Sequence, residues 1–269
     1  MKKLRLLSSF TTVLLFCFLP VVVQAQTSDN SVDAGLDALQ QGRFAEAERI
    51  LTAALKDADA KKSQDKTMVS ILDGLGAVYL NQNKYTEAEE KFRRSLALRE
   101  KLFGTEHIDL VYSLINLAAT YGKQRKYKEA EQHYIRSLAI MQKNSGVDLS
   151  LVTSTLNNFG GLYFDEGKYN QAETLLKQSV ELREKYLGPE HPSVATGLLG
   201  LASLYRQQER YKEAEPLYQR ALAIMEKALG PTHPRIATVL EHYAVLLRKT
   251  GRDAEAEKLE ARAKTILRK

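Results

Sequence analysis

The stretch Gly188–Leu229 reads GPEHPSVATGLLGLASLYRQQERYKEAEPLYQRALAIMEKAL and is 42 residues long. The same text begins again at Gly230, and steps of 42 residues towards the N-terminus reach Gly146 and Gly104. The tyrosine of the RYKEAE segment recurs at the same interval, as Tyr211, Tyr169, Tyr127 and Tyr85. A fixed period of this size indicates an array of stacked structural repeats.

Each repeat contains two amphipathic helical patterns. In the quoted unit the first pattern consists of Val194, Leu198, Leu201, Ala202 and Tyr205. The second consists of Ala214, Tyr218, Ala221, Leu222 and Met225. Both spacings place their apolar side chains on one face of a helix. Only Gln207–Arg210 separates the two patterns, which predicts an antiparallel helical hairpin with a tight turn.

Small residues recur where the two helices of a hairpin must approach each other. Gly76, Ala118, Gly160, Ala202 and Ala244 share one position, and Ala88, Ala130, Ala172, Ala214 and Ala256 share the other. With the flanking leucines and aromatic residues, this pattern resembles the tetratricopeptide repeat. The 42-residue length, the LGPEHP loop and the EAEPLYQRAL run resemble the kinesin light chain type of that repeat. The resemblance covers about Ser31 to Leu267. It implies an all-α fold, a right-handed α-solenoid of six helix hairpins.

The sequence predicts one repeat array over 26–269. Its repeats run over about 31–64, 65–106, 107–148, 149–190, 191–232 and 233–269. We expect helices at Ser31–Gln41, Phe44–Asp59, Thr67–Gln82, Tyr85–Phe103, Ile108–Gln124, Tyr127–Asn144, Ser150–Glu166, Tyr169–Leu187, Pro192–Gln208, Tyr211–Leu229, Pro234–Thr250 and Asp253–Leu267. In the last repeat Glu260 replaces the aromatic residue Phe92, Tyr134 or Tyr218, whose ring we expect to pack on the next repeat. We interpret this charge as part of a terminal cap.

The first 25 residues have the pattern of a bacterial-style secretory signal peptide. A basic start, Met1–Arg5, precedes the uncharged and mostly apolar segment Leu6–Val23, and Val23-Gln24-Ala25 offers small residues for cleavage after Ala25. The chain is therefore expected to be exported to the periplasm or secreted. The alternative is an uncleaved anchor, because about 18 apolar residues could nearly span a bilayer. The one cysteine, Cys17, lies within this segment, so the mature chain would have no disulfide.

Charge and composition argue against several classes of function. Lys2, Lys3 and Arg5 contribute half of the net charge of +6, and no acidic residue precedes Asp29. Alternating Lys and Glu residues on the second helices indicate solvated faces, so no nucleic acid is expected as a partner and no membrane after signal cleavage. His107, His191 and His233 recur in one inter-repeat loop, which indicates a structural role at the start of a helix. No catalytic residues, metal ligands or cofactor site are predicted, and the chain is expected not to be an enzyme.

A second stripe on each first helix lies opposite its core stripe. In the third repeat it includes Tyr112 and Asn116, and in the fourth Asn157, Asn158 and Phe164. In the fifth and sixth it includes Arg206, Arg248 and Lys249. An idle solvent face would be rich in Lys and Glu, whereas these stripes are small, asparagine-bearing and sparsely charged. Asparagine can both donate to and accept from an extended backbone, and arginine suits a carboxylate.

The family resemblance implies that this stripe lines a concave groove in which first-helix asparagines contact a peptide backbone. Asn116, Asn157 and Asn158 match those positions, whereas Gly74, Gly200 and His242 replace asparagine in the other repeats. The sequence thus predicts a non-catalytic scaffold that binds a peptide segment or partner protein in its groove. Two alternatives stay open. The asparagines could bond one another across helices, or the protein could be a structural assembly subunit that uses its convex face or its ends.

Overall fold

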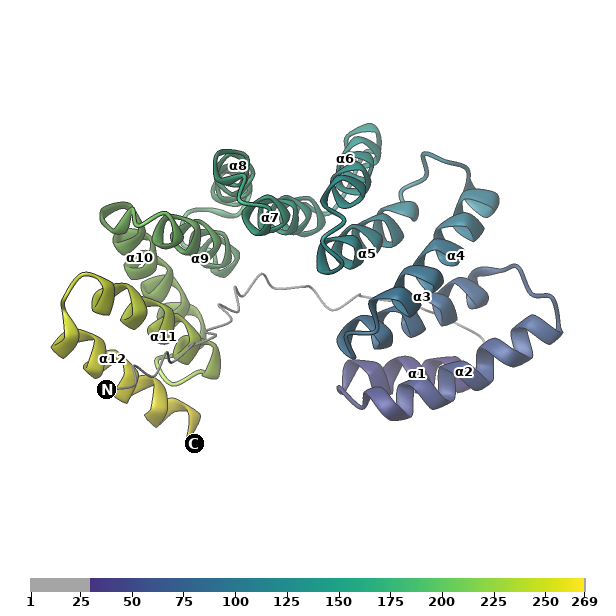
Figure 1. Cartoon of the computed structure of the whole chain (residues 1–269), viewed down its shortest axis with the longest axis horizontal. Coiled ribbons are helices and arrows are strands. Elements are labelled where there is room, and N and C mark those ends of the chain that lie inside the picture. The colour runs from purple at the N-terminus through teal and green to yellow at the C-terminus, as the bar shows by residue number, and fades with distance from the viewer. Residues whose placement is uncertain (1–29, 269) are drawn as a thin grey trace, which may run out of the picture.

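A computed structural model describes residues 30–268, and the predicted signal peptide lies outside these residues. The described chain forms twelve α-helices, no strands and six helical hairpins (Figure 1), as predicted. The helices are α1 (Asn30–Gln40), α2 (Phe44–Ala60), α3 (Lys66–Asn81), α4 (Tyr85–Phe103), α5 (Leu110–Lys123), α6 (Tyr127–Lys143), α7 (Leu149–Asp165), α8 (Tyr169–Leu187), α9 (Pro192–Gln207), α10 (Tyr211–Leu229), α11 (Pro234–Lys249) and α12 (Asp253–Leu267).

The six second helices begin at the predicted residues, and four of the first helices begin elsewhere. The helices α1 and α3 each begin one residue earlier than predicted. The helix α5 begins at Leu110 rather than Ile108, because the backbone N–H groups of Leu110 and Val111 bond three residues back and form a turn before the helix. The helix α7 begins at Leu149 rather than Ser150. There the Asp148 side chain accepts a hydrogen bond from the Ser150 N–H at 2.8 Å, which caps the helix start.

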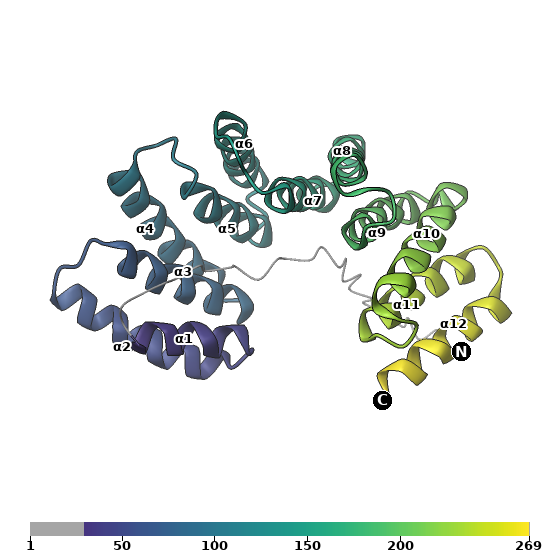
Figure 2. The ribbon, with the colours of Figure 1, turned by 180° about the vertical axis from the view of Figure 1, so that it is seen from behind.

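The helices form two layers of an arc. Figure 1 shows α5, α7 and α9 along its inner side with α6 and α8 outside them, and Figure 2 shows the same order from behind. Each first helix packs against the first helix of the next repeat, whereas within residues 30–268 neighbouring second helices are joined only through long charged side chains, as in the ion pairs Arg94–Asp59, Arg136–Glu100, Arg220–Glu184 and Arg262–Glu226. The inner layer is therefore more closely packed than the outer one, and this difference curves the array. The first helices line the concave side, as the resemblance implied.

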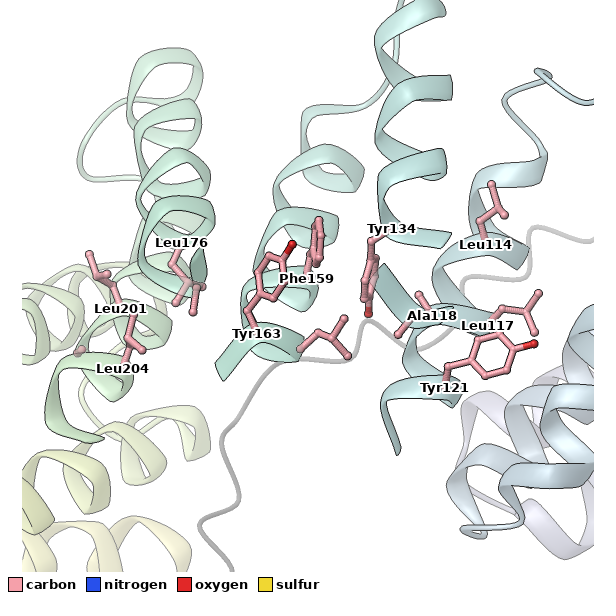
Figure 3. Packing of buried hydrophobic residues seen from close by; sticks show 14 of the residues in the cluster. Leu114, Leu117, Ala118, Tyr121, Tyr134, Phe159, Tyr163, Leu176, Leu201 and Leu204 are labelled. Carbon is pink, nitrogen blue, oxygen red and sulfur yellow. The ribbon is translucent and has the colours of Figure 1, made fainter. Parts of the chain in front are cut away.

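Small and aromatic side chains fill the contacts between helices in the predicted way. A Cβ atom added at Gly76 would lie 2.6 Å from the ring of Phe92, so only glycine fits at this approach. Tyr134 stacks on Phe159 of the next repeat with ring centroids 5.2 Å apart (Figure 3). Tyr218 stacks in the same way on Tyr243. The prediction that these tyrosines pack on the following repeat is confirmed.

A ladder of carboxylates also joins the repeats. In the first five repeats, the last glutamate of the EAE run, or of the QAE run at 171–173, pairs with a lysine or arginine in the next hairpin turn. The pairs are Glu48–Lys84, Glu89–Lys126, Glu131–Lys168, Glu173–Arg210 and Glu215–Arg252. Three of these glutamates, namely Glu131, Glu173 and Glu215, also accept a hydrogen bond from a tyrosine hydroxyl of the next first helix. The glutamates of this recurring motif thus form contacts between repeats, in addition to lying in a solvated turn.

The last hairpin ends in an ion pair instead of an aromatic contact. Arg248 donates to Glu260 through Nε and Nη2, each at 2.9 Å, and its Nη1 lies 3.4 Å from Asp253. Both partners are charged residues of the sixth repeat and remain partly exposed. A charged end of this kind would not recruit a further repeat, which agrees with the interpretation of Glu260 as part of a cap.

Candidate functional site

The concave side holds a cavity of about 470 Å³ that spans the first four repeats. Its apolar part includes Leu39 of α1, Phe44 of α2, Leu80 of α3 and Ile115 of α5. Its polar part includes Asn81, Asn83, Asn116, Lys123 and Asn158. Apolar walls with a few convergent polar groups are the usual composition of a ligand site. The first helices contribute most of this lining because they form the inner layer.

Asn116 is the central polar group of this cavity. Its side chain is only 8% exposed, and its Nδ2 atom has no hydrogen-bond partner in the described part of the chain. A buried amide without a partner costs about 1–3 kcal/mol. Asn158, one repeat later, is half-buried and also forms no hydrogen bond within residues 30–268. A ligand that accepts from Asn116 would remove this cost, so the two amides are suited to bind a polar backbone.

Asn157 takes a different place from its neighbour Asn158. Its side chain is 8% exposed, and its Oδ1 accepts a hydrogen bond from Arg183 Nη1 at 3.4 Å. It lines a second, smaller cavity on the far side of α7. None of the three predicted asparagines bonds another asparagine within residues 30–268. The three side chains therefore fall into two sites that meet at α7.

The other predicted side chains line neither cavity. Tyr112 is half-buried on α5, and Phe164 packs at a tilt against Tyr169 with ring centroids 5.7 Å apart. The Nε of Arg206 lies 3.4 Å from the Tyr218 hydroxyl. Arg248 bonds Glu260, and Lys249 is exposed. The expected positive end is thus not assembled with the asparagines, because Arg248 belongs to the terminal ion pair.

Sequence reasoning missed the first two repeats and two arginines. Asn81 lies 42 residues before Lys123, at a position that belongs to the stripe in later repeats, so extending the period backwards could have found it. Leu39 of α1 and Phe44 of α2 lie 41 residues before Leu80 and Tyr85, so a step one residue shorter than the period could have found them as well. Arg183 and Arg235 also lie outside the stripe, although both line the smaller cavity.

Two titratable groups on the predicted stripes are perturbed. Burial raises the pKa of Asp165, while Lys123 and Arg125 act in the opposite direction. Burial, with a smaller contribution from Arg206, lowers the pKa of His242 below its ordinary value. His242 is therefore neutral at neutral pH, so it can donate or accept a hydrogen bond but adds no positive charge.

The recurrent loop histidines have the structural role that their spacing predicts. Nδ1 of His107, His191 and His233 accepts a hydrogen bond from the backbone N–H two residues later, each at 3.2 Å. His191 and His233 thereby cap the starts of α9 and α11. Within residues 30–268 no group of three or more His, Asp or Glu side chains could hold a metal ion. No helix in this range is long and apolar enough to cross a bilayer.

Family models for the tetratricopeptide repeat match residues 67–143, 151–227 and 193–269, and a second such model matches residues 32–101. The chain belongs to the tetratricopeptide repeat family. The matches together span all six hairpins, and neither model describes an enzyme family. No curated protein sequence matched this tetratricopeptide repeat protein significantly.

Solved structures share this tetratricopeptide fold at low identity. BtubC (BKLC) from P. vanneervenii is 20% identical with a TM-score of 0.67, and the match covers 88% of this chain and 91% of that one. Kinesin light chain TPR-like repeats of Podosopora anserina are 24% identical with a TM-score of 0.63, covering 74% and 95%. A Rap protein complexed with Competence and Sporulation Factor is 13% identical with a TM-score of 0.59, covering 88% and 74%. These likenesses show the fold, and kinesin light chain repeats are among the neighbours.

Proposed function

We propose that this tetratricopeptide repeat protein is a non-catalytic scaffold that binds an extended peptide segment across α3, α5 and α7. The observation that carries the proposal is the buried Nδ2 of Asn116, which has no partner in the described chain and lines the 470 Å³ cavity. An extended backbone supplies carbonyl oxygens for this amide and for Asn158. The apolar lining at Leu80 and Ile115 would take the side chains between them. A solved Rap protein of similar fold was captured with a bound factor, which supports this use of the fold.

The test begins with a peptide selected from a random display library against purified residues 26–269. Its affinity is then measured by fluorescence anisotropy for the parent and for the Asn116→Ala/Asn158→Ala variant. Loss of two hydrogen bonds worth about 0.5–1.5 kcal/mol each should weaken binding by about tenfold or more, with a melting temperature no lower than that of the parent. Asn170→Ala with Gln178→Ala, both exposed on the outer helix α8, is the matched control and should bind like the parent.

The outcomes separate the remaining explanations. A double variant that melts much earlier than the parent would assign the two asparagines to structure. Unchanged affinity would place the peptide elsewhere on the protein. If no peptide is selected and the purified chain forms a stoichiometric homo-oligomer by sedimentation, the structural assembly subunit is the better description.

We also propose that the protein is exported by cleavage of residues 1–25, and that it then acts in the periplasm or as a secreted protein. The basis is the signal-like order of basic start, apolar segment and Val-Gln-Ala site. N-terminal sequencing of the exported form should begin at or near Gln26. A form that still begins at Met1 and resists extraction from membranes would show an uncleaved anchor instead.

A further inference from the structure

An arginine ties neighbouring second helices together at four of the five joints between repeats in residues 30–268. It lies on one second helix and pairs with an acidic residue on the second helix before it. The pairs are Arg94–Asp59, Arg136–Glu100, Arg220–Glu184 and Arg262–Glu226. In the last three pairs the arginine also donates to a backbone carbonyl of the loop between the two repeats, that of Thr105, Pro189 or Pro231. Such an arginine holds two repeats and their connecting loop in one arrangement.

The joint between the third and fourth repeats lacks this tie. The 42-residue period places Gln142 of α6 and Gln178 of α8 where the other joints have the acidic residue and the arginine. Both glutamines are exposed, and neither forms a hydrogen bond or ion pair within residues 30–268. Two neutral amides have no charge attraction to hold them together across solvent. The outer helices α6 and α8 are therefore not linked at this position.

Two other links are missing or longer at the same joint. In other repeats a lysine near the end of the second helix binds a side chain of the preceding loop, as in Lys101–Gln64, Lys143–Glu106 and Lys227–Glu190. The corresponding Lys185 lies over the ring of Tyr186, and no ion pair joins it to Asp148 in the described part of the chain. The pair Glu131–Lys168, at 4.0 Å, is also the longest of the five glutamate pairs in the hairpin turns.

The helix α6 ends earlier in its repeat than α4, α8 and α10 do in theirs. Those three helices have 19 residues, and each is followed by a glycine of positive φ whose N–H donates to the carbonyl four residues earlier. The helix α6 has 17 residues, and Asn144 follows it with an extended backbone. The exposed Ser145 then takes the place of Phe103 and Leu229, which are half-buried. The third repeat thus lacks the last helical turn and its apolar side chain.

The contacts that remain at this joint are near the core. The ring of Tyr134 stacks on that of Phe159 at 5.2 Å, and Phe159 stacks on Tyr163 at 4.6 Å (Figure 3). The Tyr163 hydroxyl also donates to Glu131 at 2.7 Å. Stacked rings keep a favourable contact over a range of offsets and tilts, whereas a paired guanidinium fixes both distance and direction. The joint therefore has a pivot in its core and no tie between its outer helices.

We propose that the joint between the third and fourth repeats is a hinge, about which repeats one to three and repeats four to six rotate as two units. The rotation changes the separation of α6 and α8 on the outer side, while Tyr134 stays in contact with Phe159. Asn116 and Asn158 lie on opposite sides of this joint, so the rotation also sets the distance between their amides. The hinge is a property of the free protein and requires no ligand, so it goes beyond the proposed function.

Pulsed electron paramagnetic resonance between two spin labels measures such a rotation as the width of a distance distribution. Residues 26–269 contain no cysteine, so the labels can be placed by substitution alone. Ala97→Cys/Glu181→Cys spans the hinge, and Glu181→Cys/Thr265→Cys spans an equal number of residues without it. All three positions are exposed and occupy the same place on their second helices. The first pair should give the broader distribution, and equal widths would overturn the proposal.

A third label pair assigns the motion to one joint. Lys56→Cys/Ala139→Cys joins exposed positions of the first and third repeats, and so spans two joints that both carry the arginine tie. Its distribution should be as narrow as that of Glu181→Cys/Thr265→Cys. A distribution as broad as that of Ala97→Cys/Glu181→Cys would place the motion within the first three repeats and refute the hinge.

Moving the arginine tie from one joint to another tests its role. Gln142→Glu/Gln178→Arg introduces the ion pair at the hinge with the spacing of Glu184 and Arg220, and should narrow the hinge-spanning distribution to the width of the control pair. Glu184→Gln/Arg220→Gln removes the tie between the fourth and fifth repeats, and should broaden only the distribution of Glu181→Cys/Thr265→Cys. Helical circular dichroism confirms that each variant is folded. Folded variants that leave both widths unchanged would show that the tie does not control the motion, and would overturn the proposal.

Discussion

Replacing Asp73 by Leu should destabilise the protein strongly, because it leaves a buried arginine without its carboxylate. Asp73 is 2% exposed, lies 2.6 Å from Arg99 and accepts a hydrogen bond from Ser95 at 2.6 Å. The Arg99 side chain is 13% exposed and would keep only the hydroxyls of Ser95 and Ser113. Removing one partner of a buried ion pair costs about 3–5 kcal/mol.

The chain itself offers the compensating variant. The fifth repeat carries Leu199 and Met225 at the positions of Asp73 and Arg99, so an apolar pair fits this framework. Exchanging both partners removes the charges together, and such replacements are often neutral or stabilising. Asp73→Leu/Arg99→Met should therefore stay within about 1 kcal/mol of the parent, although each single variant costs about 3–5 kcal/mol.

Urea denaturation of residues 26–269, followed by helical circular dichroism, measures both effects. The midpoint should fall in each single variant and recover in the double variant, with a constant slope. A changed slope would show that the first repeats unfold separately from the rest. The reasoning fails if Asp73→Leu costs less than about 1 kcal/mol, or if the cost of the double variant equals the sum of the single costs.

Three further perturbations test other parts of the fold. Although burial opposes it, hydrogen bonds from Arg210, Lys177 and Tyr205 lower the pKa of Glu173 to about 2. Because the pKa of Glu173 is lower in the folded state than its ordinary value of 4.5, its ionised carboxylate stabilises the fold above pH 4.5, and this stabilisation is lost as the pH falls towards 2. The difference in melting temperature between the parent and Glu173→Gln should therefore be largest near pH 6 and disappear near pH 2. Gly76→Ala should lower the free energy of unfolding by about 1–3 kcal/mol despite the better helix propensity of alanine, because its Cβ would overlap Phe92. An unchanged urea midpoint would show that the ring can move. Glu260→Tyr should increase self-association in sedimentation experiments by creating an apolar end, and a monomer at high concentration would contradict the cap interpretation.

The fold could be predicted well from the sequence because the residues that determine each helix and turn recur at the same spacing in several repeats. The starts of the second helices follow from one recurring tyrosine, and the tight turns follow from the short spacing between apolar patterns. Even where the turn residue is Arg125 or Glu209 rather than glycine, the backbone adopts a positive φ of about 60°. The backbone hydrogen bonds that close these two turns, Lys126 N–H to the Tyr121 carbonyl at 2.9 Å and Arg210 N–H to the Tyr205 carbonyl at 2.8 Å, offset the unfavourable conformation of the residue before them.

The candidate site was predicted only in part, because a binding site depends on residues that differ from one repeat to the next, and the period gives no information about these. The period pointed to Asn116 and Asn158, and both line one cavity. It gave no signal that Arg248 would bond Glu260, since this pair exists only in the divergent last repeat. It also gave no signal for Arg183, whose position on a second helix is filled by methionine in the adjacent repeats.

The asparagine position opens onto the large cavity in the third and fourth repeats for a packing reason. In the second repeat this position is Gly74, where a Cβ atom would lie 2.8 Å from both Leu36 and Leu51. At Gly74 the helix α3 therefore packs directly against α1 and α2 of the first repeat, and no side chain can project there. In the fifth repeat a Cβ atom at Gly200 would lie 3.3 Å from Leu176, which leaves little more room. The proposed recognition of a peptide backbone by asparagine is thus confined to Asn116 and Asn158. The proposal therefore requires that a ligand which extends further is held by contacts with its side chains.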